Sequence, residues 1–118
     1  MSPANNAVAR SYVAAPVLSA PIFAALGDAT RLELVSRLSR GEPRSISQLC
    51  DGLDLTRQGV SKHLRVLEEA GLVMSQRVGR EQRYIFTPEP IGEVSDYLLR
   101  VSDQWDDAVL RLKAFVED

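Results

Sequence analysis

Histidine and cysteine each occur once in this sequence of 118 residues, as His63 and Cys50. A single cysteine cannot form a disulfide within the chain, which agrees with a reducing compartment. Transition-metal sites need three or four ligands that histidine and cysteine mostly supply, so we expect no metal site and no cofactor. No serine, cysteine or carboxylate has a spacing that would support a catalytic triad, and we therefore do not expect an enzyme.

Long hydrophobic runs are also missing. No stretch of about 18 apolar residues occurs that could span a bilayer, and the first residues lack the basic start and apolar segment of a secretory signal. We therefore expect a cytoplasmic protein with no membrane partner. The composition, 45% hydrophobic and 25% charged residues, is that of an ordinary soluble protein, and the length is typical of one domain.

The charge is slightly acidic overall, with a net charge of -2, but it is unevenly distributed. Residues 56–87 contain six basic and three acidic residues, a balance of +3. Residues 88–118 contain three basic and eight acidic residues, a balance of -5. The first segment could face the phosphates of a nucleic acid, whereas the second would avoid them.

The chain is expected to form one domain over residues 17–118, preceded by a flexible arm over residues 1–16. The arm is predicted because its residues are small and polar and show no clear period. Leu18, Ile22 and Leu26 then repeat every four residues, which predicts a short first helix ended by the glycine that follows.

A second helix is predicted over residues 29–40. Asp28 stands directly before it and is a suitable N-cap, because its carboxylate can accept hydrogen bonds from the free N–H groups of the first turn. Leu32, Val35 and Leu38 repeat at helical spacing, so we expect them to form its buried stripe.

A short third helix is predicted after the turn GEPR. Ser45 and Gln48 have the S-x-x-Q spacing of a capping box, which marks the start of a helix. Its apolar residues Ile46, Leu49 and Cys50 are expected to face inward.

A longer helix follows within a few residues, with Thr56 as its N-cap and Ala70 near its end. Two helices joined by so short a turn form a helix-turn-helix. On a helical wheel Val60, Leu64 and Leu67 fall together and must pack on the domain. The opposite side carries Gln58, Ser61, Lys62 and Arg65, with Arg57 nearer its edge. These side-chain types bind base edges and phosphates in a major groove, while a solvated surface is the alternative for any basic amphipathic helix.

The segment LVMSQRVGREQRYIFT, residues 72–87, has β-branched and aromatic residues on both sides of Gly79. This pattern predicts a hairpin with its tip at Gly79, Arg80 and Glu81. A hairpin in this place would project as a wing. The predicted fold is therefore mainly α with a β-hairpin wing, a winged helix-turn-helix.

A long final helix is predicted after Pro88 and Pro90. Its apolar residues alternate by three and four and form two heptad series, Ile91, Leu98, Trp105 and Leu112, and Val94, Val101, Ala108 and Phe115. Such a seam predicts dimerisation through this helix. Trp105 lies in the seam, where it either packs in the dimer or core or forms a wall of a small-molecule pocket between subunits.

Three segments, FAALGDATRLELVSRL, SISQLCDGLDLTRQGVSKHLRVLEEAGLV and VGREQRYIFTP, resemble the ArsR/SmtB family of small bacterial winged-helix repressors in order and spacing. The resemblance covers roughly residues 21–115. It implies a homodimer built from the first and last helices, with the helix after Thr56 in the major groove. It also implies that Arg80 on the wing reaches toward the minor groove or a phosphate. His63 stands at an S-x-H-L position where the family often has a histidine that contacts the DNA backbone or packs.

Two sets of site residues follow from these patterns and from the resemblance. The residues expected to contact double-stranded DNA are Thr56, Arg57, Gln58, Ser61, Lys62, His63, Arg65, Arg77, Arg80 and Arg83. The residues expected to form the dimer are Leu18, Ile22, Ile91, Val94, Leu98, Val101, Trp105 and Leu112. The expected function is sequence-specific transcriptional regulation by a homodimeric repressor that binds an inverted-repeat operator. A winged-helix module that binds proteins rather than DNA is the alternative, which the acidic pI of about 5.4 favours.

Metal-sensing members of this family use a cysteine pair in the short helix, or histidine and carboxylate sets on the last helix. Here Cys50 stands alone, and the last helix has no histidine. The resemblance therefore carries over no metal site and leaves the effector open. Cys50 continues the apolar side of its helix, where core packing and a redox switch are the two interpretations.

Overall fold

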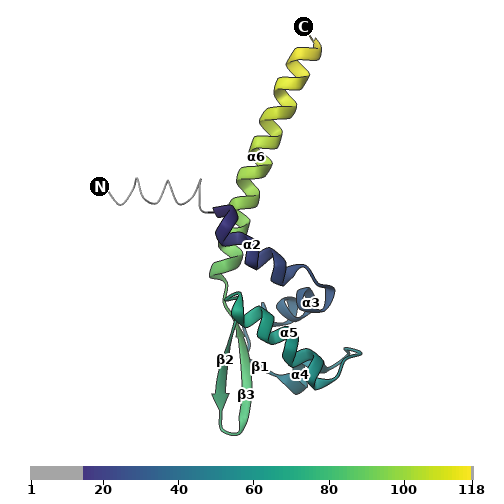
Figure 1. The fold of residues 1–118 in the computed structure, drawn as a ribbon, viewed down its shortest axis with the longest axis vertical. Helices are drawn as coiled ribbons and strands as arrows, with labels where there is room; N and C mark the ends of the chain where they lie inside the picture. The colour runs from purple at the N-terminus through teal and green to yellow at the C-terminus, as the bar shows by residue number, and fades with distance from the viewer. Residues whose placement is uncertain (1–14, 118) are drawn as a thin grey trace, which may run out of the picture.

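The computed structural model describes residues 15–117, which form a cluster of helices beside a small sheet, with a long C-terminal helix projecting from it (Figure 1). The helices are α2 (Ala15–Leu26), α3 (Ala29–Leu38), α4 (Ile46–Cys50), α5 (Arg57–Glu69) and α6 (Glu89–Glu117). The strands are β1 (Arg44–Ser45), β2 (Val73–Val78) and β3 (Glu81–Phe86). This order confirms the predicted mainly α fold with a hairpin wing.

Helix α2 begins at Ala15, so the last two residues of the predicted flexible arm belong to this helix. The rest of that predicted arm, residues 1–14, lies outside the described residues. The helix crosses α6 near the start of its projecting part (Figure 1). Phe23 of α2 meets Tyr97 of α6 edge to face, with ring centroids 6.1 Å apart, which is a favourable geometry for two aromatic rings.

The core is built around α5. Its Val60, Leu64 and Leu67 are fully buried, as the helical wheel predicts, and they pack with the leucines of the neighbouring helices and with Tyr84 of β3. Cys50 of α4 is partly buried against the same cluster, which agrees with the core-packing interpretation of this residue.

The predicted buried stripe of α3 is partly wrong. Leu34 is fully buried, whereas Leu32 is 52% exposed. Leu38 is buried as expected, and Val35 packs against the core from one side. Leu32 stands three residues before Val35, whereas Leu34 stands four residues before Leu38, so helical spacing alone allows either leucine on the buried side. The choice is made by α5, which packs on the face that carries Leu34.

The sheet has the order β1-β3-β2 and is antiparallel throughout. Strand β1 was not expected from the sequence, because two residues are too few to show an alternating pattern. The capping box at the start of α4 is confirmed, since Ser45 Oγ accepts from the Gln48 N–H at 3.2 Å and Gln48 Oε1 accepts from the Ser45 N–H at 2.9 Å. Ser45 thus belongs to the sheet and to the helix cap at once.

The wing is the hairpin of β2 and β3, paired from Val73 with Phe86 to Val78 with Glu81. The turn consists of Gly79 and Arg80 alone, so Glu81, expected at the tip, is the first residue of β3. Gly79 has φ of 65°, in the left-handed region that a two-residue hairpin turn requires and that glycine adopts without steric cost.

Asp28 caps α3 as predicted, and its Oδ2 accepts from the Arg31 N–H at 3.0 Å. This bond lowers the pKa of Asp28, against the opposing effect of burial, and the charges of His63 and Arg31 lower it further. A carboxyl group whose pKa is lower in the folded state stabilises the protein above its unfolded pKa, and that contribution is lost as pH falls through the folded value.

We expect Asp28→Asn to reduce the acid sensitivity of folding, because asparagine also caps helices but does not titrate. The urea midpoint of the unmodified protein should fall more steeply than that of the variant between about pH 5 and pH 3. Asp54→Asn changes an exposed carboxyl before α5 and serves as the control. Equal pH slopes for the unmodified protein and Asp28→Asn would contradict this role of the cap.

Candidate nucleic-acid interface

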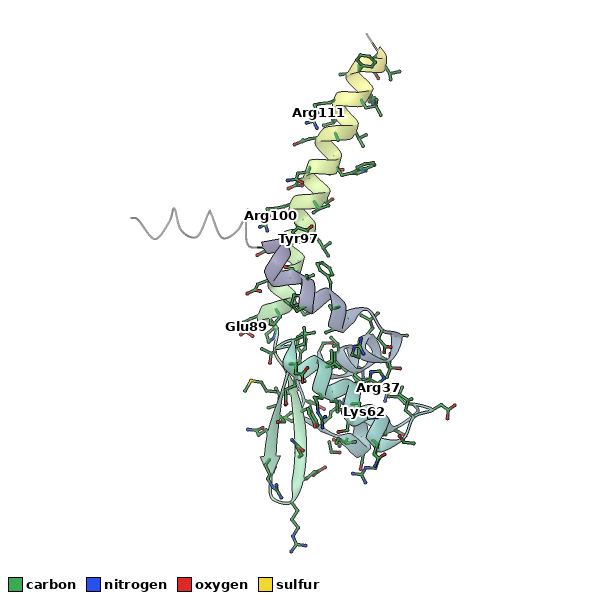
Figure 2. All side chains as sticks on the ribbon, in the orientation of Figure 1. Arg37, Lys62, Glu89, Tyr97, Arg100 and Arg111 are labelled. Carbon is green, nitrogen blue, oxygen red and sulfur yellow. The ribbon has the colours of Figure 1, made fainter. Side chains whose placement is uncertain are left out.

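Helix α5 turns its polar side to solvent. Thr56, Arg57, Gln58, Lys62 and Arg65 are all exposed, and Ser61 is half-buried. The structure therefore places the predicted reading side opposite the buried Val60, Leu64 and Leu67. Figure 2 shows Lys62 on this helix, in the half of the molecule that also holds the wing.

The first turn of α5 is held by its cap. Thr56 Oγ1 accepts from the Gly59 N–H at 3.0 Å, so the threonine expected at the DNA surface also fixes the start of the helix. A Cβ atom placed on Gly59 would lie 3.4 Å from Thr56 Oγ1 and 3.8 Å from the Leu55 side chain, which are ordinary contact distances. Packing within the protein therefore leaves room for a methyl group at this position.

A hollow of about 520 Å³ lies between α5, the start of α4 and the wing. Arg57 of α5 and Arg80 of the wing turn both line it, together with Ser45, Ile46, Ser47, Val78, Glu81 and Gln82. The sequence places Arg57 and Arg80 far apart, and the fold brings them to one concave surface. Two guanidinium groups and a hydroxyl can bind an anion such as a phosphate. Ser47 was missed by sequence reasoning, although the capping box at Ser45 fixes where it lies.

The three wing arginines differ in their surroundings. Arg77 Nε donates to the Gly79 carbonyl at 3.4 Å and is exposed. Arg83 is half-buried, and its Nη2 lies 3.2 Å from Glu81 Oε2. Arg80 sits exposed at the turn. Arg80 and Arg77 are therefore better placed for an external ligand than Arg83, which is paired within its own strand.

His63 lies on the flank of α5 and faces α3. Its Nδ1 is 3.2 Å from Arg31 Nη1 and 3.8 Å from Asp28 Oδ2, and its side chain is 24% exposed. The packing interpretation of His63 accounts for this contact, since Nδ1 is engaged by the protein itself.

The predicted dimer residues separate into two groups. Ile22 and Val94 are 5% and 6% exposed and pack in the core of a single protomer, so little of either side chain is left for a subunit contact. Leu98, Val101, Trp105 and Leu112 are exposed, while the side chain of Leu18 is outside the described structure. The difference arises because the start of α6 packs on its own domain and the later turns project beyond it.

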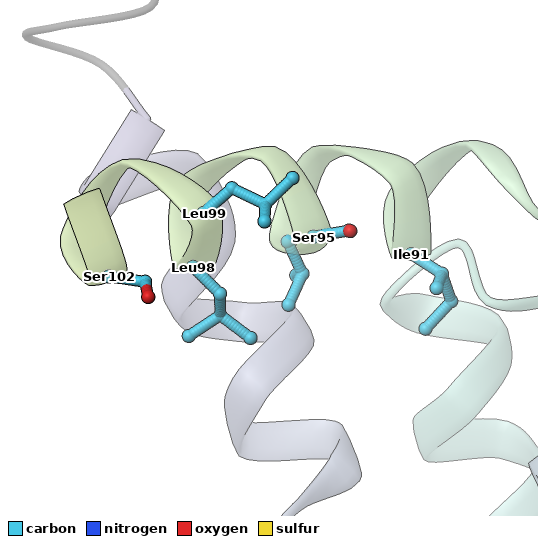
Figure 3. Close-up of a pocket in the computed structure, with 6 residues that line it drawn as sticks. Ile91, Ser95, Leu98, Leu99 and Ser102 are labelled. Atoms are coloured by element: carbon cyan, nitrogen blue, oxygen red, sulfur yellow. The ribbon is translucent and has the colours of Figure 1, made fainter.

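A groove of about 390 Å³ runs along the first turns of α6 (Figure 3). It is lined by Ile91, Val94, Ser95, Leu98, Leu99 and Ser102, which come from three successive turns of the one helix. The groove is mainly apolar, and the exposed Trp105 and Leu112 continue along the same helix.

Other kinds of site find little support in residues 15–117. That range contains no group of three or more His, Cys, Asp or Glu side chains that could hold a metal ion. The helices of the same range include none with the length and apolar content needed to cross a bilayer.

The short helix α4, the tight turn, the exposed side of α5 and the adjacent wing define a winged helix-turn-helix protein. Residues 26–76 match a family described as a helix-turn-helix domain. The structure is similar to an ArsR-like transcriptional regulator from Rhodococcus sp. RHA1, with a TM-score of 0.75 and 36% identity over 87% of this chain and 96% of that chain. An ArsR family transcriptional regulator, RHA00566, has a TM-score of 0.70 and 32% identity over 77% of this chain and 93% of that one.

Two curated relatives are also transcriptional regulators by name. The uncharacterized HTH-type transcriptional regulator YuzN of Bacillus subtilis is 42% identical over 76 residues, which are 59% of this chain and 83% of the relative. The arsenical resistance operon repressor of Escherichia coli is 33% identical over 72 residues, 61% of this chain and 62% of that repressor. The chain belongs to the ArsR family of transcriptional regulators.

Because Thr56 caps α5, we expect Thr56→Ala to lower the free energy of unfolding by about 1 kcal/mol. Thr56→Ser keeps a hydroxyl acceptor for the Gly59 N–H and should lose much less. Urea unfolding of the two variants measures the difference. A loss as large in Thr56→Ser as in Thr56→Ala would show that the hydroxyl is not the stabilising group.

Proposed function

We propose that the protein is a sequence-specific DNA-binding repressor that acts in the cytoplasm as a homodimer on an inverted-repeat operator. The observation that carries the proposal is the hollow in which Arg57 of α5 and Arg80 of the wing meet beside the exposed polar side of α5. A surface of this shape can follow a duplex, with the helix in the major groove and the wing beside it.

Each predicted contact has a role in this arrangement. Gln58, Lys62 and Arg65 are exposed along α5, with the half-buried Ser61 on the same side, and these side chains would bind base edges or nearby phosphates. Arg57 and Arg80 would bind the backbone where it crosses the hollow, and Arg77 would add a wing contact. Thr56 contributes chiefly through the helix cap, and His63 and Arg83 through contacts within the protein.

The acidic net charge does not oppose DNA binding in this arrangement. The acidic residues from Glu89 to Glu117 lie on α6, which extends away from α5 and the wing (Figure 1). Basic charge is concentrated on the side chains of α5 and the wing. An approaching duplex would therefore meet local positive charge first.

The homodimer is supported by the apolar surface of α6. Leu98, Trp105 and Leu112 are 50%, 69% and 64% exposed in the single protomer. They belong to one heptad series, and a second copy of the helix would bury them. A two-fold dimer presents two copies of α5, so the operator should have dyad symmetry.

Repression would follow from occupancy, since a dimer bound across a promoter excludes polymerase. The arsenical resistance operon repressor is a relative with this kind of role. An effector, whose identity stays open, would act by binding the DNA-competent and DNA-incompetent shapes with different affinity.

The first test is selection of bound fragments from a random duplex pool. We expect an enriched inverted repeat with half-site centres about one or more helical turns apart. Binding should weaken with salt with a log-log slope of about -5 to -7, if roughly six to eight phosphates are neutralised. Failure to be retained on duplex DNA at low salt would instead support the protein-binding module.

Two variants separate base reading from backbone contact. Arg65→Ala should reduce the preference for operator over scrambled duplex by about 1 to 3 kcal/mol if Arg65 binds a base. Arg80→Ala should weaken binding to both duplexes alike. Equal weakening of both duplexes by Arg65→Ala would assign Arg65 to a phosphate.

The dimer surface is tested by Leu98→Glu combined with Leu112→Glu, which places two buried charges in the proposed interface. We expect monomers in sedimentation and a large loss of operator affinity. Leu110→Glu is a matched control, because Leu110 is 63% exposed and lies about 200° round the helix from Leu112. An unchanged sedimentation coefficient in the double variant would refute this interface.

A further inference from the structure

Arg31 of α3 contacts two other helices with one guanidinium group. Its Nε donates to the carbonyl of Ala25, and its Nη2 donates to the carbonyl of Ala24 at 3.3 Å. Its Nη1 lies 3.2 Å from Nδ1 of His63 on α5. Helices α2, α3 and α5 therefore meet at a single side chain.

The chemistry of the arginine fixes the direction of these bonds. A guanidinium group carries only donors, so in this contact Arg31 Nη1 donates and His63 Nδ1 accepts. The carbonyls of Ala24 and Ala25 belong to the last turn of α2, where helical carbonyls lack partners within the helix. The Ala24 carbonyl also accepts from the Gly27 N–H at 3.2 Å, so Arg31 adds a second donor there and supplies a side-chain donor to Ala25, while it contacts a polar atom of α5 at the same time.

The backbone of Arg31 is fixed as well. Its N–H donates to Asp28 Oδ2 at 3.0 Å, and Asp28 Oδ2 lies 3.8 Å from His63 Nδ1. Both ends of the residue are therefore anchored, and the guanidinium has little freedom to follow a shift of α5 relative to α2.

We propose that Arg31 is a positioning residue for operator recognition, which sets the placement of α5 relative to α2. The proposal rests on the proposed function. Helix α2 crosses and contacts α6, which carries the proposed dimer surface, while α5 carries the reading side (Figure 1). The separation of the two reading helices in the dimer therefore depends on the junction of α2 with α5, and Arg31 bridges that junction without facing DNA.

A positioning role predicts an effect on operator geometry rather than on affinity alone. In the unmodified dimer, lengthening or shortening the operator by one base pair between its half-sites should weaken binding by about tenfold. Arg31→Met should reduce this preference to within about threefold. Partial unfolding of the variant cannot produce that result, because it would lower the apparent affinity for the unmodified, lengthened and shortened operators by the same factor.

Matched variants identify the bond involved. His63→Leu should lose the spacing preference as Arg31→Met does, whereas His63→Asn keeps an acceptor near the position of Nδ1 and should retain it. Arg40→Met removes the same charge from the exposed turn after α3 and should also retain it. An unchanged spacing preference in Arg31→Met would overturn the proposal.

A second measurement needs no DNA and so separates this proposal from the function on which it rests. Nitroxide labels at Ala20→Cys in α2 and Gln58→Cys in α5, in a Cys50→Ser background, report the distance between the helices when labelled chains are diluted with unlabelled protein. We expect a narrow distance distribution that broadens in Arg31→Met and stays narrow in Arg40→Met. Equal widths in all three proteins would overturn the positioning role, even if the protein binds its operator.

Discussion

The burial of one side of α5 is the constraint on which the rest of the structure depends. Val60, Leu64 and Leu67 are fully buried, and exposing all three would cost roughly 5 to 9 kcal/mol, comparable with the whole stability of a small domain. The helix therefore cannot rotate to hide Lys62 or Arg65. The hydrophobic effect therefore turns the polar side chains of α5 to solvent. The helix caps and the guanidinium of Arg31 then adjust the position of α5 within the domain.

Features encoded in neighbouring residues could be predicted from the sequence. The caps at Asp28, Ser45 and Thr56 depend on residues three positions apart, and the wing depends on a glycine between two β-rich runs. The buried side of α5 was also predicted, because its three apolar residues point to a single face. The same segments carried the resemblance to the ArsR family, to which the chain belongs.

Features that depend on contacts between distant elements could not be predicted. The choice of Leu34 over Leu32 is made by packing against α5, and Ile22 and Val94 pack within their own protomer although their spacing also fits a dimer seam. The hollow that joins Arg57 to Arg80, and the contact of Arg31 with His63, bring together residues separated by more than 20 positions. Helical periodicity identifies the apolar face of a helix but does not show which helix, strand or second protomer packs against it.

The two-residue turn of the wing has a consequence for how this protein can diversify. Gly79 alone supplies the left-handed backbone, and Arg80 beside it is exposed. Substitution of Arg80 would therefore change the contacts of the turn at little cost to folding. An inserted residue would instead disturb the pairing of Val78 with Glu81. Selection can change the chemistry of this loop freely while its length stays under strict constraint.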